Sequence, residues 1–215
     1  MMRHSILVVM LVAGPWLLSA QCEPEKMIRI VVRDASPGIP EGHFAREPKT
    51  MYRYGAKYAR LEEAPDKAHK IHGLMITSQP DSWLVNLEDK TGQHVVDPDP
   101  NGKVHIIVFH GIEMPDKFPA EFGKLEYGCE LAFFASFGSP AETLKTQDGD
   151  FIKQAVGIGE WMVVLLRKST KSPPSVLFLF HNNEIHSVIE YLEFSEIEKI
   201  DMKLFAKPEG ITIKN

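Results

Sequence analysis

Hydrophobic and polar residues alternate along much of the chain, which is the pattern of a β-strand with one buried face. Turns rich in proline, glycine and aspartate separate these stretches. Strands are expected at 27–33, 50–62, 70–78, 81–87, 94–96, 104–109, 160–167, 175–181, 184–194 and 211–213. The sequence therefore predicts a mainly β (α+β) protein, built as a curved antiparallel sheet or an incomplete β-barrel.

Two of the late segments are apolar almost throughout instead of alternating. They are EWMVVLLR at 160–167 and SVLFLFH at 175–181. Both faces of such strands must be shielded from water. Asn182 and Asn183 follow the second segment, and because asparagine tolerates positive φ, they predict a two-residue hairpin turn that leads into the next strand.

Helical periodicity is confined to one region, within residues 119–137, where Gly123 and Gly128 weaken it. After it, Ser139-Pro140-Ala141-Glu142 resembles a capping box with proline at the first helical position, which predicts a short helix through about Lys145. We expect these helical segments to cover one face of the sheet. The apolar residues that recur at three- and four-residue steps are Phe118, Phe122, Leu125, Cys129, Ala132 and Phe133.

The chain begins with a short basic start, an apolar run and a small residue, Ala20, before the polar Gln21. This is the anatomy of a secretory signal peptide over residues 1–20, and the run is short for the alternative, a membrane anchor. A strand and an irregular arm follow at 21–49, and the curved sheet domain is expected at 50–215. Cleavage near Ala20 would give a periplasmic or secreted protein without a transmembrane span.

The two cysteines, Cys22 and Cys129, leave several possibilities open. In an oxidising compartment they can form a disulfide. Alternatively, Cys22 is free and Cys129 is buried. Lipid attachment at Cys22 is disfavoured, because Gln21 occupies the position where a lipoprotein signal carries a small residue.

The sequence offers no pattern for metal binding, a cofactor or catalysis. The net charge of −5 argues against nucleic acid as a partner. The paired histidines, such as His69 and His72, fall at spacings that place them on opposite faces of a strand, so a metal site is not predicted. There is no Gly-x-Ser-x-Gly nucleophile motif, and Cys129 lies on an apolar face that disfavours a reactive thiolate. We therefore expect a non-catalytic protein.

Large aromatic side chains on the expected strands are the remaining candidates for a site. They either fill the core or line a cavity that binds an apolar ligand, and strand periodicity does not say which face is concave. The candidate lining residues are Trp83, Phe109, Trp161 and Phe178.

Four segments together resemble the LolA-like superfamily of periplasmic lipoprotein carriers and lipoprotein-sorting proteins. They are TMYRYGAKYARLE (50–62), DSWLVNLEDKTGQHVVD (81–97), SVLFLFHNNEIHSVIEYLEF (175–194) and LFAKPEGITI (204–213). The resemblance implies a curved sheet whose last strand is turned onto the sheet edge by the Pro-Glu-Gly corner. Family carriers open with an amphipathic helix, which residues 27–42 do not supply. Arg53 and Arg60 are both candidates for the arginine that holds the lid of such carriers.

The expected function is to bind a lipid or the acyl chain of a lipoprotein in an apolar concave cavity. One alternative is an envelope protein–protein interaction module with a filled core, with the arm at 34–49 as the surface for a protein partner. A third is an envelope hydrolase, for which the residues provide no catalytic constellation.

Overall fold

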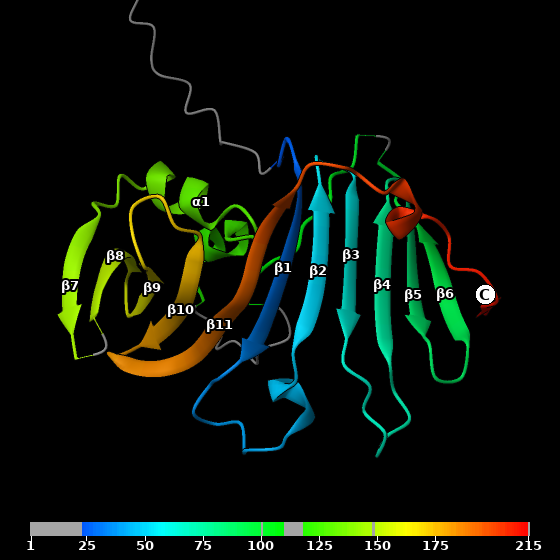
Figure 1. Ribbon diagram of the computed structural model, residues 1–215, viewed down its shortest axis with the longest axis horizontal. Helices are drawn as coiled ribbons and strands as arrows, with labels where there is room; N and C mark the ends of the chain where they lie inside the picture. The colour runs from blue at the N-terminus through cyan, green and yellow to red at the C-terminus, as the bar shows by residue number, and fades with distance from the viewer. Residues whose placement is uncertain (1–22, 100, 110–117, 148, 215) are drawn as a thin grey trace, which may run out of the picture.

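One open, curved sheet makes up most of the molecule (Figure 1). The computed structural model describes residues 23–99, 101–109, 118–147 and 149–214, so the expected signal peptide and Cys22 lie outside the described residues. Within the described part, twelve strands follow the order β12-β6-β5-β4-β3-β2-β1-β11-β10-β9-β8-β7. Neighbouring strands are antiparallel except β12 and β6, which are parallel. The prediction of a mainly β protein with a curved, largely antiparallel sheet is confirmed.

Most expected strand segments in the first and last thirds of the chain form strands. Residues 50–62, expected as one strand, instead form two antiparallel strands joined by a turn at 55–57, and the strand at 149–158 was not expected. The strands are β1 Met27–Asp34, β2 Lys49–Tyr54, β3 Tyr58–Glu63, β4 Gly73–Ser78, β5 Asp81–Asn86, β6 Thr91–Val96, β7 Glu142–Thr146, β8 Gly149–Ile158, β9 Trp161–Arg167, β10 Pro174–His181, β11 Glu184–Ile197 and β12 Thr212–Ile213. The helical elements are the 3-10 turns η1 Phe44–Arg46, η2 Ala120–Lys124 and η3 Met202–Phe205, and the α-helix α1 Glu130–Ser136. In the described part of the chain, no helix has the length and hydropathy to cross a membrane.

Strand β1 joins two antiparallel runs of strands. It pairs with β2 on one side and with β11 on the other. Strands β2 to β6 follow each other as neighbours, and β7 to β11 do the same. The segment 21–49 therefore contributes the central strand of the same sheet to which residues 50–213 belong.

Turn chemistry sets the register of the β10–β11 hairpin. Asn182 and Asn183 have φ angles of 52° and 64°, so both adopt the left-handed conformation that the sequence predicts for this turn. At the end of the chain, β12 pairs with β6 at the sheet edge. The expected last strand after the Pro-Glu-Gly corner is thus confirmed.

Two predictions for the middle of the chain are wrong. The helical region 119–137 is broken into η2 and the short α1, and Gly128 lies between them with φ of 83°. A Cβ at Gly128 would meet the end of the Ile28 side chain, and the positive φ is a backbone conformation that residues other than glycine rarely adopt. Residues 104–109 do not form a strand; they form an irregular, mostly buried segment with one isolated bridge, from Ile107 to Glu126.

The helix predicted through Lys145 is also wrong, because this stretch forms strand β7. Pro140 and Glu142 suit a helix start, but the sequence Glu142–Thr146 can instead pair with the neighbouring β8. Cross-strand hydrogen bonds satisfy its backbone, and its threonines favour an extended conformation. Tertiary pairing therefore overrides the local capping pattern.

The main core lies on one face of the sheet, which we call the inner face. A stretch of largely irregular chain, residues 102–109 and 118–137, packs over this face, and we call it the covering segment. Its apolar side chains meet those of β1, β2 and β8 to β11. The buried residues of this core are Ile28, Ile30, Val32, Met51, Ala59, Val104, Ile106, Val108, Phe109, Phe122, Leu125, Tyr127, Phe133, Phe134, Val156, Trp161, Val163, Leu165, Leu177, Leu179 and Ile189.

A second, smaller core lies on the outer face of β4 and β5, under the C-terminal segment. In η3, the ring of Phe205 packs against Tyr58 with 5.5 Å between centroids. Ile211 and Ile213 pack against the buried group Leu74, Ile76, Trp83 and Val85. The tail therefore closes the outer face of the sheet and does not fray.

Candidate functional site

The covering segment packs over only part of the inner face of the sheet and leaves the strands toward β6 open. The strand register places Met51, Leu61, Met75, Leu84 and Gln93 directly opposite one another across β2 to β6. Met51 is 2% exposed, Leu61 and Met75 are half-buried, and Leu84 is 47% exposed. Burial thus falls steadily along this row from the centre of the sheet toward β6.

A second row shows the same gradient. Arg53, Ala59, Thr77, Ser82 and Val95 are opposite one another on the same five strands. The first three are buried, whereas Val95 is 51% exposed. The two rows share the inner face, because Met51 and Arg53 are two residues apart in β2.

Together the rows define an open apolar patch made of Leu61, Met75, Leu84 and Val95. It adjoins the main core at Met51 and extends toward the edge of the sheet, where Ser82 and Gln93 of the same rows lie beside it. Apolar side chains exposed side by side on one face are a feature of binding surfaces. This patch is the candidate functional site.

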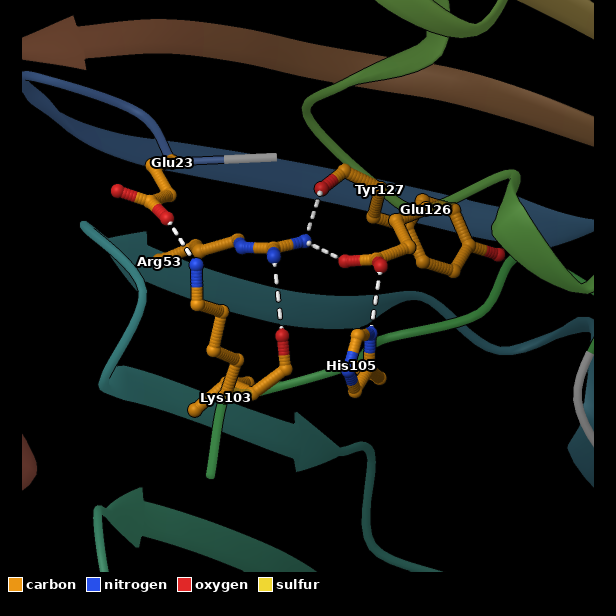
Figure 2. A network of polar contacts seen from close by, with 7 residues as sticks. Glu23, Arg53, Lys103, His105, Glu126 and Tyr127 are labelled. Carbon is orange, nitrogen blue, oxygen red and sulfur yellow. Dashed lines mark hydrogen bonds and ion pairs between the residues drawn. The ribbon is translucent and has the colours of Figure 1, made fainter. Parts of the chain in front are cut away.

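A buried arginine ties the covering segment to the sheet beside this patch (Figure 2). The Arg53 side chain is 2% exposed, and its Nη1 lies 2.6 Å from Oε2 of Glu126, whose side chain is 8% exposed. Arg53 Nη1 also donates to the carbonyl oxygen of Tyr127 at 3.3 Å, and Nη2 donates to that of Val104 at 3.0 Å. One side chain on β2 therefore holds two separate parts of the covering segment.

The second oxygen of Glu126 is also engaged. His105 Nδ1 lies 2.7 Å from Oε1 of Glu126, and the imidazole is largely exposed. Nearby, Lys103 Nζ pairs with Glu23 (Figure 2). We call Arg53, Glu126, His105 and the carbonyls of Val104 and Tyr127 the Arg53 network. Between the two arginines left open by the sequence, Arg53 contacts the covering segment, whereas Arg60 bonds to Glu62 and to the Leu204 carbonyl.

A buried carboxyl lies four residues further along the covering segment. Oε1 of Glu130 accepts hydrogen bonds from the Tyr191 hydroxyl at 2.6 Å and from the Gly128 N–H at 2.9 Å. Burial raises the pKa of Glu130 above its ordinary value of 4.5, and these hydrogen bonds and the charge of Arg53 offset part of the rise. Burial also raises the pKa of Tyr191. The net result is that the folded state holds the Glu130 proton more tightly than the unfolded state does.

The four aromatic residues expected to line a cavity do not share one surface. Phe109 and Trp161 are buried in the main core of the inner face. Trp83 belongs to the second core on the outer face, beneath the C-terminal segment. Phe178 is half-buried and alternates with the inner-face residues Leu177 and Leu179, so it lies on the outer face. The expectation of a common lining made by these four is corrected accordingly.

Sequence reasoning missed the open patch because it followed the largest side chains. Trp83, Val85 and Leu87 share a face, but the C-terminal segment covers that face. Leu84 and Val95 occupy the alternate positions of β5 and β6. The C-terminal tail offered a signal for this. It carries the apolar residues Ile211 and Ile213, which pack against the Trp83 face, and the Leu84 face is then the one left open.

Titratable groups in the described ranges provide no metal site, since no group of three or more histidine, cysteine, aspartate or glutamate side chains converges there. Cys129 is disulfide-bonded, and Cys22, the other cysteine of the sequence, lies outside the described residues. The Cys22–Cys129 pairing therefore stays a prediction.

Comparisons with known proteins concern the fold. No family model and no curated protein matches the sequence. An uncharacterized conserved protein from Thermus thermophilus is 9% identical, with a TM-score of 0.49, and the match covers 88% of this chain and 90% of that one. A LolA superfamily protein from Nitrosomonas europaea, NE2245, is 11% identical, with a TM-score of 0.38 and coverage of 89% and 94%.

A third match, to PNGF-II, is 11% identical with a TM-score of 0.37 and covers 88% of this chain but 32% of that one. A LolA superfamily protein is thus among the solved structures that this chain resembles. With TM-scores below 0.5, these likenesses carry no argument about a ligand or an activity.

Replacing Arg53 by methionine is expected to destabilise the fold by about 3–5 kcal/mol, because Glu126 would keep a buried charge without its partner. Arg60→Met is the matched control: Arg60 is 20% exposed and pairs with Glu62, so its loss should cost about 1 kcal/mol or less. Urea unfolding of both variants measures the difference. Equal free energies of unfolding for the two variants would contradict the role given to the Arg53 network.

Glu130→Gln is expected to change the pH dependence of stability. In the wild type the folded state holds the Glu130 proton more tightly than the unfolded state, so the stability linked to this proton is present at low pH. It is lost as pH rises above 4.5 through the raised pKa of the folded state. The glutamine variant cannot lose a proton, so its stability relative to wild type should increase with pH over this window. Urea unfolding at a series of pH values tests this, and a pH-independent difference would refute it.

Proposed function

We propose that this protein is a non-catalytic carrier that binds the acyl chain of a lipid or acylated protein on the open apolar patch of the inner face. The observation that carries the proposal is the gradient of burial from Met51, which is 2% exposed, to Leu84, which is 47% exposed, along one row of facing residues. The open apolar patch is continuous with the main core on one side and open to solvent on the other. A flexible apolar ligand fits such a surface without specific polar partners.

The energetics of the patch suit an acyl chain. Each large aliphatic side chain that is fully removed from water contributes about 1.5–3 kcal/mol, so completing the burial of Leu84 and Val95 contributes roughly half of that each. The ligand's own methylene groups add about 0.8 kcal/mol each. A guest that covers the patch would extend the main core across β5 and β6.

The patch also adjoins the Arg53 network. Arg53 and Val95 stand at opposite ends of the second row, with Ala59, Thr77 and Ser82 between them. An acyl chain that continues from the patch toward the sheet centre would meet the part of the covering segment that Arg53 holds. The length of the bound chain would then depend on how far this segment is displaced.

Export is part of the proposal. The apolar run and Ala20 support cleavage of a signal peptide, and a disulfide at Cys129 is typical of an oxidising compartment. We propose a periplasmic or secreted carrier for the same reason.

Leu84→Asp is expected to weaken binding of a fluorescent fatty acid, such as 11-dansylamino-undecanoic acid, by about tenfold or more, because a carboxylate would have to be desolvated against the acyl chain. Titration of the dansyl fluorescence measures the dissociation constant. Since Leu84 is half exposed, the unfolding free energy should change by about 0.5 kcal/mol or less.

Ile185→Asp is the matched control, because Ile185 is 44% exposed but lies at the β10–β11 hairpin, outside both rows. It should bind the fatty acid as the wild type does. Absence of saturable binding to the wild type, or equal weakening in the two variants, would reject acyl binding at the patch.

Peptide mapping of the exported protein without reduction is expected to give one peptide pair that links Cys22 to Cys129, with Gln21 as the first residue. The reason is that Cys129 is disulfide-bonded and the sequence contains one other cysteine. A lipid-modified Cys22 would contradict the pairing, and an uncleaved N-terminus would contradict the proposed export.

A further inference from the structure

Strand β11 extends well beyond the strand that pairs with it on one side. It runs from Glu184 to Ile197, and β10 pairs only with the part up to Glu190, whereas β1 pairs with Ile189 to Ile197. Figure 1 shows β10 and β11 separating beyond this point. Among the described residues, no strand pairs with the 191–197 part on the side away from β1. Backbone N–H and C=O groups on that side are a ready template for a further strand.

A groove of about 810 Å³ lies along this unpaired edge. One wall is formed by the ends of β1 and β11, including Ile28, Phe194 and Glu196. The opposite walls are residues 128–132 at the start of α1 and residues 171–174 in the β9–β10 connection. The groove therefore occupies the place that a longer β10 would fill.

The rim of the groove prevents the protein from closing it with its own strand. Pro173 and Pro174 stand where β10 would have to extend, and proline has no N–H to pair with β11. On the α1 wall, the apolar side chain of Leu131 remains 41% exposed. The residues that line this groove do not include any from the edge strand β7.

Charge at the groove is mildly acidic. Glu23, Glu25 and Glu196 line it together with two lysines, Lys26 and Lys171. Lys26 Nζ lies 3.0 Å from Glu196 and 2.9 Å from Glu198, and Lys103 pairs with Glu23, so the exposed carboxylates in and beside the groove exceed the lysines by one. The groove is thus complementary to basic or neutral side chains and unfavourable for acidic ones.

We propose that this groove binds an extended segment of a partner polypeptide, which adds a strand to residues 191–197 of β11. Main-chain hydrogen bonds would supply the affinity, and alternate side chains would supply the specificity. Side chains directed into the groove would be apolar, against Phe194 and Leu131, and those directed outward would be basic or neutral. The site is separate from the open apolar patch, so it does not depend on acyl binding.

The test uses a ten-residue probe peptide of alternating lysine and valine, acetylated and amidated at its ends, with the purified protein. In a second peptide the backbone amide nitrogens of all lysines are methylated, and in a third those of all valines. Strand addition predicts that one methylated set loses binding by about tenfold or more while the other binds as the parent does, because alternate amides point toward β11 and toward solvent. Hydrogen exchange followed by NMR should slow at amides of residues 191–197 and stay unchanged in β7.

Variants and outcomes separate this site from non-specific binding. Leu131→Lys should weaken the lysine–valine peptide by about tenfold, whereas Leu144→Lys, at a similarly exposed position on β7, should leave it unchanged. A glutamate–valine peptide should bind more weakly than the parent.

Equal loss of binding with both methylated peptides, protection outside residues 191–197, or no saturable binding at millimolar peptide would overturn the proposal. So would displacement of the probe by a peptide of residues 1–22, which would assign the groove to the protein's own N-terminal segment. Failure here leaves the fatty-acid titration at Leu84 unaffected.

Discussion

The fold depends on a buried arginine that satisfies the backbone of an irregular segment. A curved sheet needs cover on its inner face, and here the cover is mostly neither helix nor strand, so its carbonyl groups lack regular partners. Arg53 donates to two of them, at Val104 and Tyr127, and its charge is balanced by Glu126. Without this side chain, the apolar residues of the covering segment could reach the core only by burying unpaired polar groups.

Because Arg53 holds the covering segment over one part of the sheet, the two halves of the inner face differ in how deeply their side chains are buried. Arg53 stands on β2, near the middle of the sheet, and the covering segment that it holds packs over β1, β2 and β8 to β11. From β3 toward β6, burial decreases until Leu84 and Val95 are about half exposed. The open patch is therefore a consequence of where the cover is fixed, and its boundary is the Arg53 network itself.

Sequence patterns predicted most of the strands, missed β7 and β8, and predicted poorly which face of the sheet is covered. Alternation and the Asn182-Asn183 turn are local signals, and they gave the strands and the late hairpin. Whether the Trp83 face or the Leu84 face is covered depends on where the distant C-terminal tail packs, which no local signal contains. Residues 142–146 fit a helix start but form β7, because pairing with β8 stabilises the extended conformation. Arg53 could be shortlisted with Arg60, but only the fold shows which of them meets Glu126.

One short stretch of the covering segment connects the two proposed binding surfaces. Glu126 and Tyr127 belong to the Arg53 network beside the open patch, and Glu130 and Leu131, a few residues later, belong to the wall of the β11 groove. Between them, Gly128 adopts a left-handed backbone conformation against the side chain of Ile28, and Cys129 is held by a disulfide. The disulfide and the packing of Gly128 hold this stretch in place between the two surfaces. A fixed stretch of this kind separates the open apolar patch from the β11 groove, so acyl binding and strand addition remain independent of each other.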